Sequence, residues 1–313
     1  MQAPKRHFLD IAPLPASDLR AILDAAAVRK AGRGSLPRGA QDADAPLAGH
    51  VLAMIFQKAS TRTRVSFDGA IRQLGGSALV MSASEMQLGR GETVQDTARV
   101  IGSMVDAVMI RANAHQDVLD YAAVSPVPVI NGLTNLSHPC QILADLQAIE
   151  ERLGDVKGRT IAWVGDGNNV CTSYIHAAGK LGFSLQIACP EGYAPPTQEV
   201  QAAQAAGAKI TLHDSPAKAA AAANVVVTDT WVSMGDEDKD QRYAAFPPYQ
   251  VNEALMSKAA KDAVFLHCLP AHRGEEATDA VLDGPNSGVW DAAENRLHAQ
   301  KAILLWCFGL VSP

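Results

Sequence analysis

Short apolar runs alternate with amphipathic helical patterns along most of this chain. We expect strands at 51–56, 78–81, 107–111, 127–131, 160–164, 184–188, 209–212, 225–228 and 264–267. Strands that alternate with helices predict a mostly parallel sheet. The alternation restarts after a long helix expected from Pro139 to about Leu153, so the pattern predicts two such sheets. We therefore expect an α/β fold of two domains, each a mostly parallel sheet flanked by helices, with an active-site cleft between them.

Local signals indicate where the domains and several helices begin and end. One domain is expected at 1–137 together with a C-terminal helix at 294–313, and the other at 138–293. Ser17 is expected to cap the first helix, and Thr93 begins a Thr-x-x-Asp pattern typical of a capping box. A final helical segment is expected at 294–310, and 229–249 is interpreted as a long polar loop.

The composition bounds the class of protein. A chain of 313 residues is long enough for two domains of ordinary size. Lys and Arg total 27 and Asp and Glu total 33, and this net charge of −6 argues against a general nucleic-acid binder. No apolar run approaches the ~20 residues that span a bilayer, and the first ten residues lack the apolar core of a secretory signal. We expect a cytoplasmic protein without nucleic-acid or membrane partners.

Five cysteines are spread along the chain without a Cys-x-x-Cys pair. An odd number without paired spacing indicates neither a zinc site nor a disulfide framework. Reduced thiols in the cytosol fit this pattern best. We expect no metal and no other cofactor.

The run Ser-Thr-Arg-Thr-Arg at 60–64 joins a predicted strand to a predicted helix. The N-terminus of a helix carries partial positive charge and free N–H groups, which suit a phosphate or another anion. Hydroxyl and guanidinium groups add charge-assisted hydrogen bonds to phosphate oxygens. The simpler interpretation is a Ser or Thr N-cap followed by solvated arginines.

The motif His138-Pro139-Cys140-Gln141 places an imidazole and an amide at the start of the long helix. The positive end of a helix favours a neutral histidine, which is a good hydrogen-bond donor to a polarised carbonyl group. A histidine at this position can also be only a structural cap.

A glycine- and asparagine-containing loop at 165–170 follows a strand and precedes a helix. It resembles a dinucleotide fingerprint, but Val170 replaces the third glycine and no convincing acid follows about 20 residues later. The two asparagines can instead bind a carboxylate or an amine, or hold a turn through Asx hydrogen bonds.

Two further polar clusters follow strands in the second half. Asp229 begins the run Asp-Thr-Trp-Val-Ser-Met-Gly, and a carboxylate at this position suits an ammonium ligand or a helix cap. The run at 267–276 begins His-Cys-Leu-Pro and places Cys268 near two histidines, His267 and His272, which could support a Cys/His nucleophile. Nothing in the run requires covalent chemistry, however.

Taken together, these runs resemble the aspartate/ornithine carbamoyltransferase family, in order and over essentially the whole chain. The Asp229 run with its Ser-Met-Gly loop and the His-Cys-Leu-Pro run resemble the ornithine branch. The resemblance implies that carbamoyl phosphate and L-ornithine are converted to L-citrulline and phosphate, without a metal and without a covalent intermediate. It also implies a homotrimer. Biosynthetic and catabolic directions would use the same site, so both stay open.

The resemblance also implies roles for individual residues. The residues implied to bind carbamoyl phosphate are Ser60, Thr61, Arg62, Thr63, Gln87, Arg111, His138, Pro139, Cys140, Gln141, Cys268, Leu269 and Arg296. The residues implied to bind ornithine are Asn169, Asp229, Ser233 and Met234. The residues implied in catalysis are Arg62, Arg111, His138 and Cys268. Arg111 and His138 would polarise the carbamoyl carbonyl group, Cys268 would be a contact or weak proton partner, and Gln87 would reach a neighbouring subunit's site.

Three other functions are weighed against this one. A sister carbamoyltransferase would act on N-acylornithine or putrescine, but the first lacks the α-ammonium group for Asp229 and the second lacks the carboxylate for Asn169. A non-catalytic relative would be expected to lose the basic residues, and Arg62, Arg111 and His138 are present. A Rossmann oxidoreductase would bind a nicotinamide cofactor, for which the 165–170 loop is a poor match.

Overall fold

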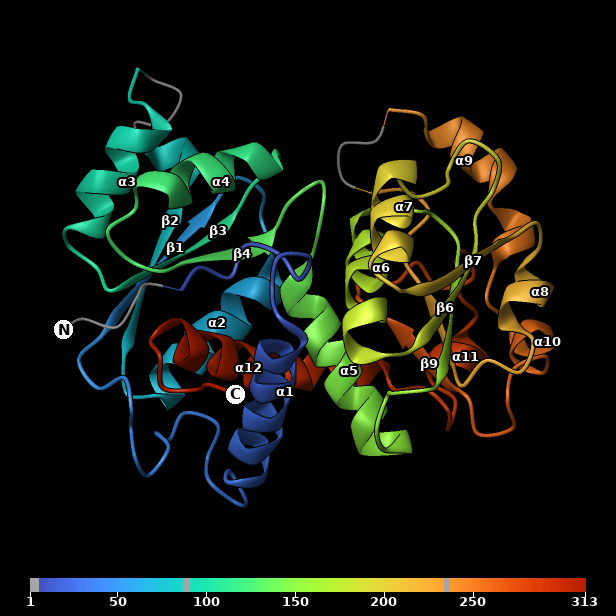
Figure 1. Cartoon of the computed structure of the whole chain (residues 1–313), viewed down its shortest axis with the longest axis horizontal. Helices are drawn as coiled ribbons and strands as arrows, with labels where there is room; N and C mark the ends of the chain where they lie inside the picture. Colours follow the sequence, from blue (N-terminus) through green and yellow to red (C-terminus); the bar gives the residue numbers. More distant parts are fainter. Residues whose placement is uncertain (1–5, 87–90, 234–236) are drawn as a thin grey trace. The chain divides into compact units, whose positions relative to one another are not determined.

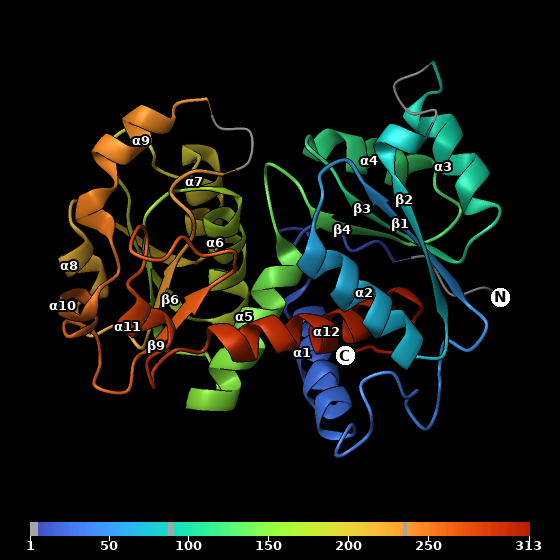
Figure 2. The same ribbon diagram turned by 180° about the vertical axis from the view of Figure 1, so that it is seen from behind.

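The computed structural model of the chain describes residues 6–86, 91–233 and 237–313 (Figure 1). By internal contacts the chain divides into two compact units, unit 1 (Met1–Ala144 with Glu294–Pro313) and unit 2 (Asp145–Ala293). Each unit contains a parallel β-sheet flanked by helices, visible from both sides in Figures 1 and 2. The α/β prediction with two sheets is therefore confirmed, whereas the cleft between the domains stays a prediction.

The sheet of unit 1 has the strand order β2-β1-β3-β4. Its strands are β1 (Val51–Phe56), β2 (Ser77–Ser82), β3 (Ala107–Arg111) and β4 (Val129–Leu133). Its helices are α1 (Ala16–Ala31), α2 (Thr61–Gln73), α3 (Val94–Gly102) and α4 (His115–Val124), with a 3-10 turn at Ala83–Glu85. Helices α3 and α4 lie on one face of the sheet, and α2 and α12 (Val289–Cys307) lie on the other. Because both faces are covered, β1 and β3 are almost entirely apolar and buried.

The register of unit 1 brings three chain segments to one edge. Phe56 at the end of β1 pairs with Arg111 at the end of β3, and Arg111 pairs with Leu133 of β4. The chain passes from β1 outward to β2 and then returns to β3 on the other side, so the strand order reverses between β1 and β3. Ligands of open α/β sheets bind at the carboxyl edge of such a reversal.

The sheet of unit 2 has the strand order β7-β6-β5-β8-β9. Its strands are β5 (Thr160–Val164), β6 (Ser184–Ala188), β7 (Lys209–His213), β8 (Val225–Thr228) and β9 (Val264–His267). Its helices are α6 (Asn169–Leu181), α7 (Thr197–Ala205), α8 (Pro216–Ala220), α9 (Lys239–Ala245), α10 (Glu253–Met256) and α11 (Asp279–Leu282), with a 3-10 turn at Pro247–Tyr249. Helix α5 (Pro139–Leu153) precedes this sheet in the chain, with the predicted bounds. Helices α6 and α7 lie on one face of the sheet and α8 on the other (Figures 1 and 2).

The strand order of unit 2 reverses between β5 and β8, since the chain adds β6 and β7 on one side and then β8 and β9 on the other. Thr228 at the end of β8 pairs with His267 at the end of β9. The residues that follow, Asp229 and Cys268, are therefore neighbours at the carboxyl edge. Both sheets thus repeat the same arrangement.

The structure corrects three local expectations. Helix α1 begins at Ala16 after Pro15, whose carbonyl group accepts the first helical hydrogen bond, so Ser17 lies inside the helix and is not its cap. Helix α12 begins at Val289 and ends at Cys307, earlier at both ends than the expected 294–310, because Gly288 precedes it and Gly309 takes a left-handed conformation after it. Thr93 caps α3 as predicted, with its hydroxyl oxygen accepting from the Asp96 N–H.

The third correction concerns 229–249, which contains α9 and a 3-10 turn rather than only a polar loop. Arg242 of α9 donates to the Asp166 carboxylate at 2.9 Å, to the Trp231 carbonyl oxygen at 2.9 Å and to Asp238 at 2.8 Å. Its guanidinium group also lies over the ring of Tyr193, 4.8 Å from the centroid. These contacts connect α9 to the loop that follows β5 and to Trp231, and no periodic pattern in the sequence reveals them.

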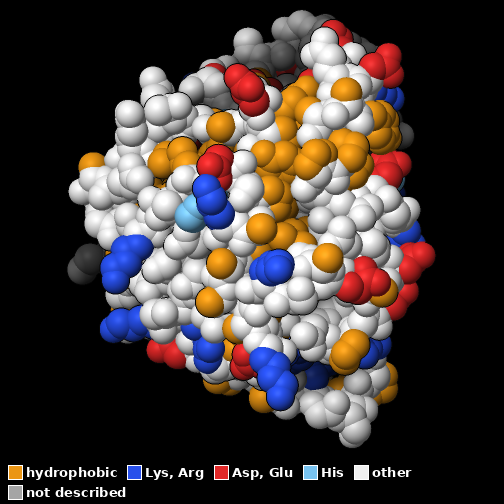
Figure 3. Space-filling model, turned by 90° about the vertical axis from the view of Figure 1, so that its right-hand side faces the viewer, with side chains coloured by type: hydrophobic (Ala, Val, Ile, Leu, Met, Phe, Trp, Pro, Cys, Tyr) orange, Lys and Arg blue, Asp and Glu red, His pale blue; other side chains and the backbone are white. Residues whose placement is uncertain are grey.

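The surface and the helices show what the chain presents to its surroundings. On the face drawn in Figure 3, apolar side chains gather in a band, and basic and acidic side chains are scattered around it. Among residues 6–86, 91–233 and 237–313, none of the helices combines the length and the apolar character needed to cross a membrane.

His298 of α12 lies in a buried, cationic part of unit 1. Its side chain is buried, and Lys301 and Lys30 lie near it. Burial first, and then these two ammonium groups, lower the pKa of His298 to about 4. A histidine of the unfolded chain titrates near ~6.5. Between these two values the unfolded state binds a proton that the folded state does not bind.

We expect the free energy of unfolding to fall as pH decreases from 6.5 to about 4, with His298 contributing at most ~1.4 kcal/mol per pH unit. The variant His298→Gln removes this titrating group, so its free energy of unfolding should change less steeply with pH. Urea denaturation at several pH values measures both slopes. Identical slopes for the two proteins would show that His298 is readily protonated in the folded chain.

Candidate functional site

The Ser60 loop is built as the sequence predicts, with Ser60 as the N-cap of α2. Its hydroxyl oxygen accepts from the Thr63 N–H at 3.3 Å, and the same hydroxyl group donates to Thr63 Oγ1 at 3.0 Å. Thr61 is exposed in the first turn of α2, and Arg62 is half-buried beside it. The simple interpretation as a helix cap is therefore correct for Ser60. The cap alone does not identify the ligand of the Thr61 hydroxyl and Arg62 guanidinium groups.

Arg296 of α12 joins the two motifs of unit 1. Its guanidinium group donates to Gln141 Oε1 at 2.7 Å and to Thr63 Oγ1 at 3.1 Å. Arg296, Gln141 and Thr63 are all buried. The Ser60 loop and the His138 motif therefore share one buried arginine, which comes from the far end of the chain.

His138 lies next to three arginines at the start of α5. It is buried, and burial lowers its pKa well below the ordinary value of 6.5. The positive charges of Arg296, Arg111 and Arg62 lower it further, in that order. The imidazole is therefore neutral near pH 7, and it can donate a hydrogen bond to a carbonyl oxygen without adding charge. The sequence predicted a neutral imidazole from the helix end, whereas the structure assigns the effect to burial and three guanidinium groups.

Pro139 and Cys140 of the same motif have structural roles. Pro139 is the first residue of α5. The Cys140 thiol is buried and donates to the Asn131 carbonyl oxygen at 3.3 Å, and burial raises its pKa to about 12. This thiol is therefore protonated and held to β4, and it is not available as a nucleophile.

Together these groups form an anion-binding arrangement, which we call the cationic cluster: Arg62, Arg111, His138 and Arg296. Three guanidinium groups can neutralise a phosphate, and the Ser60 loop offers N–H and hydroxyl donors beside a helix N-terminus. The neutral imidazole suits a polarised carbonyl group on the same ligand.

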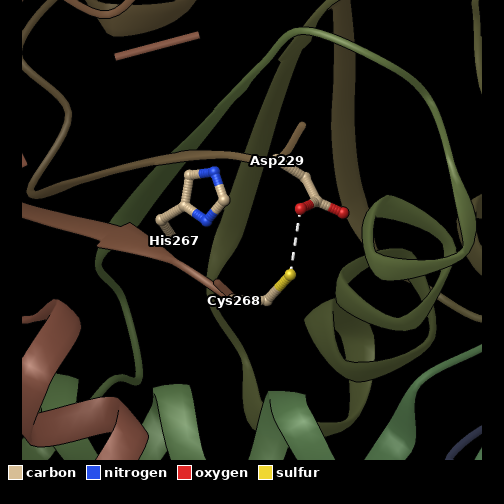
Figure 4. A group of neighbouring side chains, drawn as sticks. All are labelled: Asp229, His267 and Cys268. Carbon is tan, nitrogen blue, oxygen red and sulfur yellow. Dashed lines mark hydrogen bonds between the residues drawn. The ribbon is translucent and has the colours of Figure 1, made fainter. Parts of the chain in front are cut away.

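The corresponding cluster of unit 2 is centred on Asp229. Figure 4 shows Asp229, His267 and Cys268, which come from the ends of β8 and β9. The Cys268 thiol donates to Asp229 Oδ1 at 2.9 Å. The amide of Asn168 donates to Asp229 Oδ2 at 2.7 Å. Asp229 is buried, and both of its oxygens are held in place, so it can receive an ammonium group in a fixed position.

The two asparagines of the 165–170 loop have different roles. Asn168 is the N-cap of α6, and its Oδ1 accepts from the N–H groups of Val170 and Cys171 at 2.9 and 3.3 Å. Asn169 is the first residue of the helix and is half-buried. The sequence named Asn169 but missed Asn168, which fixes Asp229. The Asx turn considered for this loop was the signal that could have identified it.

Two other expected site residues, Ser233 and Leu269, lie in the segments that follow β8 and β9. Ser233 is half-buried, and Leu269 follows Cys268 with a left-handed backbone, at a φ of 58°. Gln87 and Met234 lie outside the described residues. The sequence also missed Glu276, whose side chain is fully buried against His267. A glutamate within an otherwise polar run gave no signal of burial.

Two groups of side chains could hold a metal ion among the described residues. They are Asp229, His267 and Cys268, and His272, Glu275 and Glu276, each with ligand atoms within 4.8 Å of one another. In the first group, both ring nitrogens of His267 are already hydrogen-bonded, to the Leu269 N–H and to Glu276. A metal bound there would have to break one of these bonds. No step of the chemistry considered below depends on a metal.

Comparisons with known proteins agree with the geometry. The family model "Aspartate/ornithine carbamoyltransferase, carbamoyl-P binding domain" matches residues 6–151, and the Asp/Orn binding domain of the same family matches residues 157–307. The chain is 61% identical over 306 residues to an ornithine carbamoyltransferase of Caulobacter vibrioides, and the match covers 98% of both chains.

Solved structures give the same result. The ornithine carbamoyltransferase from Pyrococcus furiosus is 47% identical and superposes with a TM-score of 0.92 over 99% of both chains. An anabolic ornithine carbamoyltransferase from Campylobacter jejuni is 39% identical, with a TM-score of 0.88 over 96% of this chain and 98% of the other. The resemblance inferred from the sequence is confirmed, and the chain belongs to the aspartate/ornithine carbamoyltransferase family.

Proposed function

We propose that this chain transfers the carbamoyl group of carbamoyl phosphate to the δ-amine of L-ornithine, giving L-citrulline and phosphate. The observation that carries the proposal is a neutral, buried His138 among three arginines. A carbamoyl phosphate needs both features, because its phosphate is anionic and its carbonyl group must be polarised. The names of the relatives point to the same reaction.

Unit 1 is proposed to bind carbamoyl phosphate. The N-terminus of α2 with Ser60, Thr61, Arg62 and Thr63 would hold the phosphate, and Arg111 and His138 would donate to the carbonyl oxygen. Gln141 would accept from the carbamoyl NH2 group, and its Oε1 atom is held in place by Arg296. Charge that develops on the carbonyl oxygen in the transition state would then meet donors that are already in place.

Unit 2 is proposed to bind ornithine. The fixed carboxylate of Asp229 would receive the α-ammonium group, together with Ser233 and Met234, and Asn169 would bind the α-carboxylate. The δ-amine must be neutral to attack, although a lysine-like amine has a pKa of about 10.4 in water. Exclusion of water would favour the neutral amine.

The chemical step is a displacement at the carbonyl carbon. The neutral δ-amine forms the new C–N bond and the tetrahedral centre expels phosphate. The extra N–H proton of the amine passes to the departing phosphate. The phosphate leaves with the electron pair of the broken C–O bond, and its charge is neutralised by the arginines. Positioning and electrostatics would supply most of the rate enhancement.

The finer assignments belong to the same proposal. Residues 1–137 with 294–313 would form the carbamoyl phosphate-binding domain, and residues 138–293 the ornithine-binding domain. The protein would act in the cytoplasm as a homotrimer, with Gln87 contributing to a neighbouring subunit's site. The family resemblance supports these assignments.

A substrate panel tests the proposal. With carbamoyl phosphate as donor, we expect L-ornithine to be carbamoylated with a kcat/KM at least about a hundredfold above that of putrescine or N-acetylornithine. Putrescine lacks the carboxylate proposed to bind Asn169, and N-acetylornithine lacks the ammonium group proposed to bind Asp229. Colorimetric detection of ureido products measures all three. If putrescine or N-acetylornithine reacts faster than L-ornithine, the assignment of ornithine as the substrate is wrong.

The variant Cys268→Ser tests whether the thiol is essential. A serine hydroxyl can donate to Asp229 as the thiol does, at 2.9 Å in this structure. We expect kcat to fall by less than about tenfold, or ~1.4 kcal/mol in the barrier. The measurement is steady-state kinetics with both substrates. Complete loss of turnover, with both substrates still bound, would show that Cys268 acts as a nucleophile or an obligatory acid.

A further inference from the structure

A buried histidine–glutamate pair lies directly behind the His-Cys-Leu-Pro turn. His267 is the last residue of β9, and Glu276 follows nine residues later. Both side chains are completely inaccessible to solvent, and His267 Nε2 lies 3.1 Å from Glu276 Oε1. The chemistry proposed above uses neither side chain. Two polar groups buried so completely need a reason, because each requires a partner to offset the loss of water.

The hydrogen bonds define which nitrogen of His267 carries the proton. The Leu269 N–H group donates to His267 Nδ1 at 2.8 Å, so Nδ1 must be the unprotonated acceptor. The ring proton must then lie on Nε2, which donates to Glu276 Oε1. Glu276 therefore selects the one neutral tautomer that leaves Nδ1 free to accept.

This tautomer holds a backbone conformation that a leucine rarely adopts. Leu269 has a φ of 58°, in the left-handed region that is costly for a residue with a branched side chain. Its N–H group is held by His267, two residues earlier. The bond therefore closes the turn around Cys268, whose thiol contacts Asp229.

Glu276 is itself fixed from two other directions. Its Oε1 atom also accepts from the His272 N–H at 2.5 Å, and its backbone carbonyl oxygen accepts from the Val251 N–H at 2.9 Å. Glu276 Oε1 thus accepts two hydrogen bonds, one from His267 Nε2 and one from the His272 N–H. A carboxylate held in this way can orient a histidine, as carboxylates orient imidazoles in many active sites.

We propose that Glu276 is a positioning residue that acts through His267 on the backbone of Leu269 and Cys268. This inference deepens the proposed function and rests on it, since these two residues are expected to face the carbamoyl group and the attacking amine. Glu276 would touch neither substrate. It would keep the turn in the one conformation that presents these groups to the substrates.

Two substitutions at Glu276 separate positioning from packing. Glu276→Gln keeps a side-chain oxygen that accepts both bonds, so its kcat should stay within about threefold of the wild-type value. Glu276→Leu fills a similar volume with an apolar side chain but removes the oxygen that accepts from His267 Nε2. The variant therefore no longer selects the His267 tautomer with its proton on Nε2. Its kcat for citrulline formation should fall by about tenfold to a hundredfold, the loss expected when a reacting group moves by up to ~1 Å.

A second histidine–glutamate pair in unit 2 provides the matched control. His176 of α6 lies 2.7 Å from Glu199 of α7, and its side chain is also buried. Neither residue belongs to the proposed site. Glu199→Leu should lower thermal stability but leave kcat and both KM values within about twofold. A fall in kcat equal to that of Glu276→Leu would show that both effects are only structural, and would overturn the proposal.

The tautomer provides a readout that does not depend on activity. Long-range ¹H–¹⁵N NMR spectra of histidine-labelled protein distinguish protonated from unprotonated ring nitrogens, and loss of a signal in His267→Asn assigns the residue. We expect an unprotonated Nδ1 in the wild type and in Glu276→Gln. A protonated Nδ1 in the wild type would overturn the proposal even if Glu276→Leu does not fold. A folded Glu276→Leu with wild-type kinetics would also overturn it, whereas absence of citrulline formation by the wild type would instead refute the proposed function.

Discussion

In a parallel sheet all strands end at the same edge, and this constraint determines where both halves of the proposed site lie. In unit 1 the pairing of Phe56 with Arg111 places the Ser60 loop beside the last residue of β3. In unit 2 the pairing of Thr228 with His267 makes Asp229 and Cys268 neighbours. The set of unit 1 lies where the strand order reverses, and in unit 2 the reversal lies between β5 and β8, which Asn168 and Asp229 follow. The polar groups therefore occupy the edge at which α/β sheets bind ligands.

At these edges, each cluster is centred on a buried residue, Arg296 or Asp229, that is hydrogen-bonded to residues distant from it in the sequence. Arg296 holds Gln141 and Thr63, which lie 155 and 233 positions away from it. Asn168 and Cys268 hold the two oxygens of Asp229. The groups proposed to contact substrate are therefore positioned before substrate arrives, which reduces the reorganisation needed in the transition state. A buried neutral histidine beside three arginines is the clearest electrostatic consequence.

The sequence predicted the strands, the long helix and the polar runs well, because each depends on local periodicity and capping. Only the family resemblance related Arg296 to the Ser60 and His138 motifs, since nothing local connects an arginine of the last helix to a threonine of the second. The sequence also missed that Asn168 donates to Asp229, 61 positions later in the chain, and that Glu276 is buried against His267. Arg242 of α9 is hydrogen-bonded to Asp166, although composition alone predicted 229–249 to be a polar loop.

The central claim is that the cationic cluster of unit 1 binds the phosphate of carbamoyl phosphate. Calorimetric titration of carbamoyl phosphate into the wild type and into Arg62→Ala tests it most directly, with urea denaturation of both proteins as the control for folding. We expect the Kd to rise by about tenfold to a hundredfold, the loss of a charge-assisted hydrogen bond, while the free energy of unfolding changes by less than about 1 kcal/mol. An unchanged Kd in the folded variant would contradict the assignment.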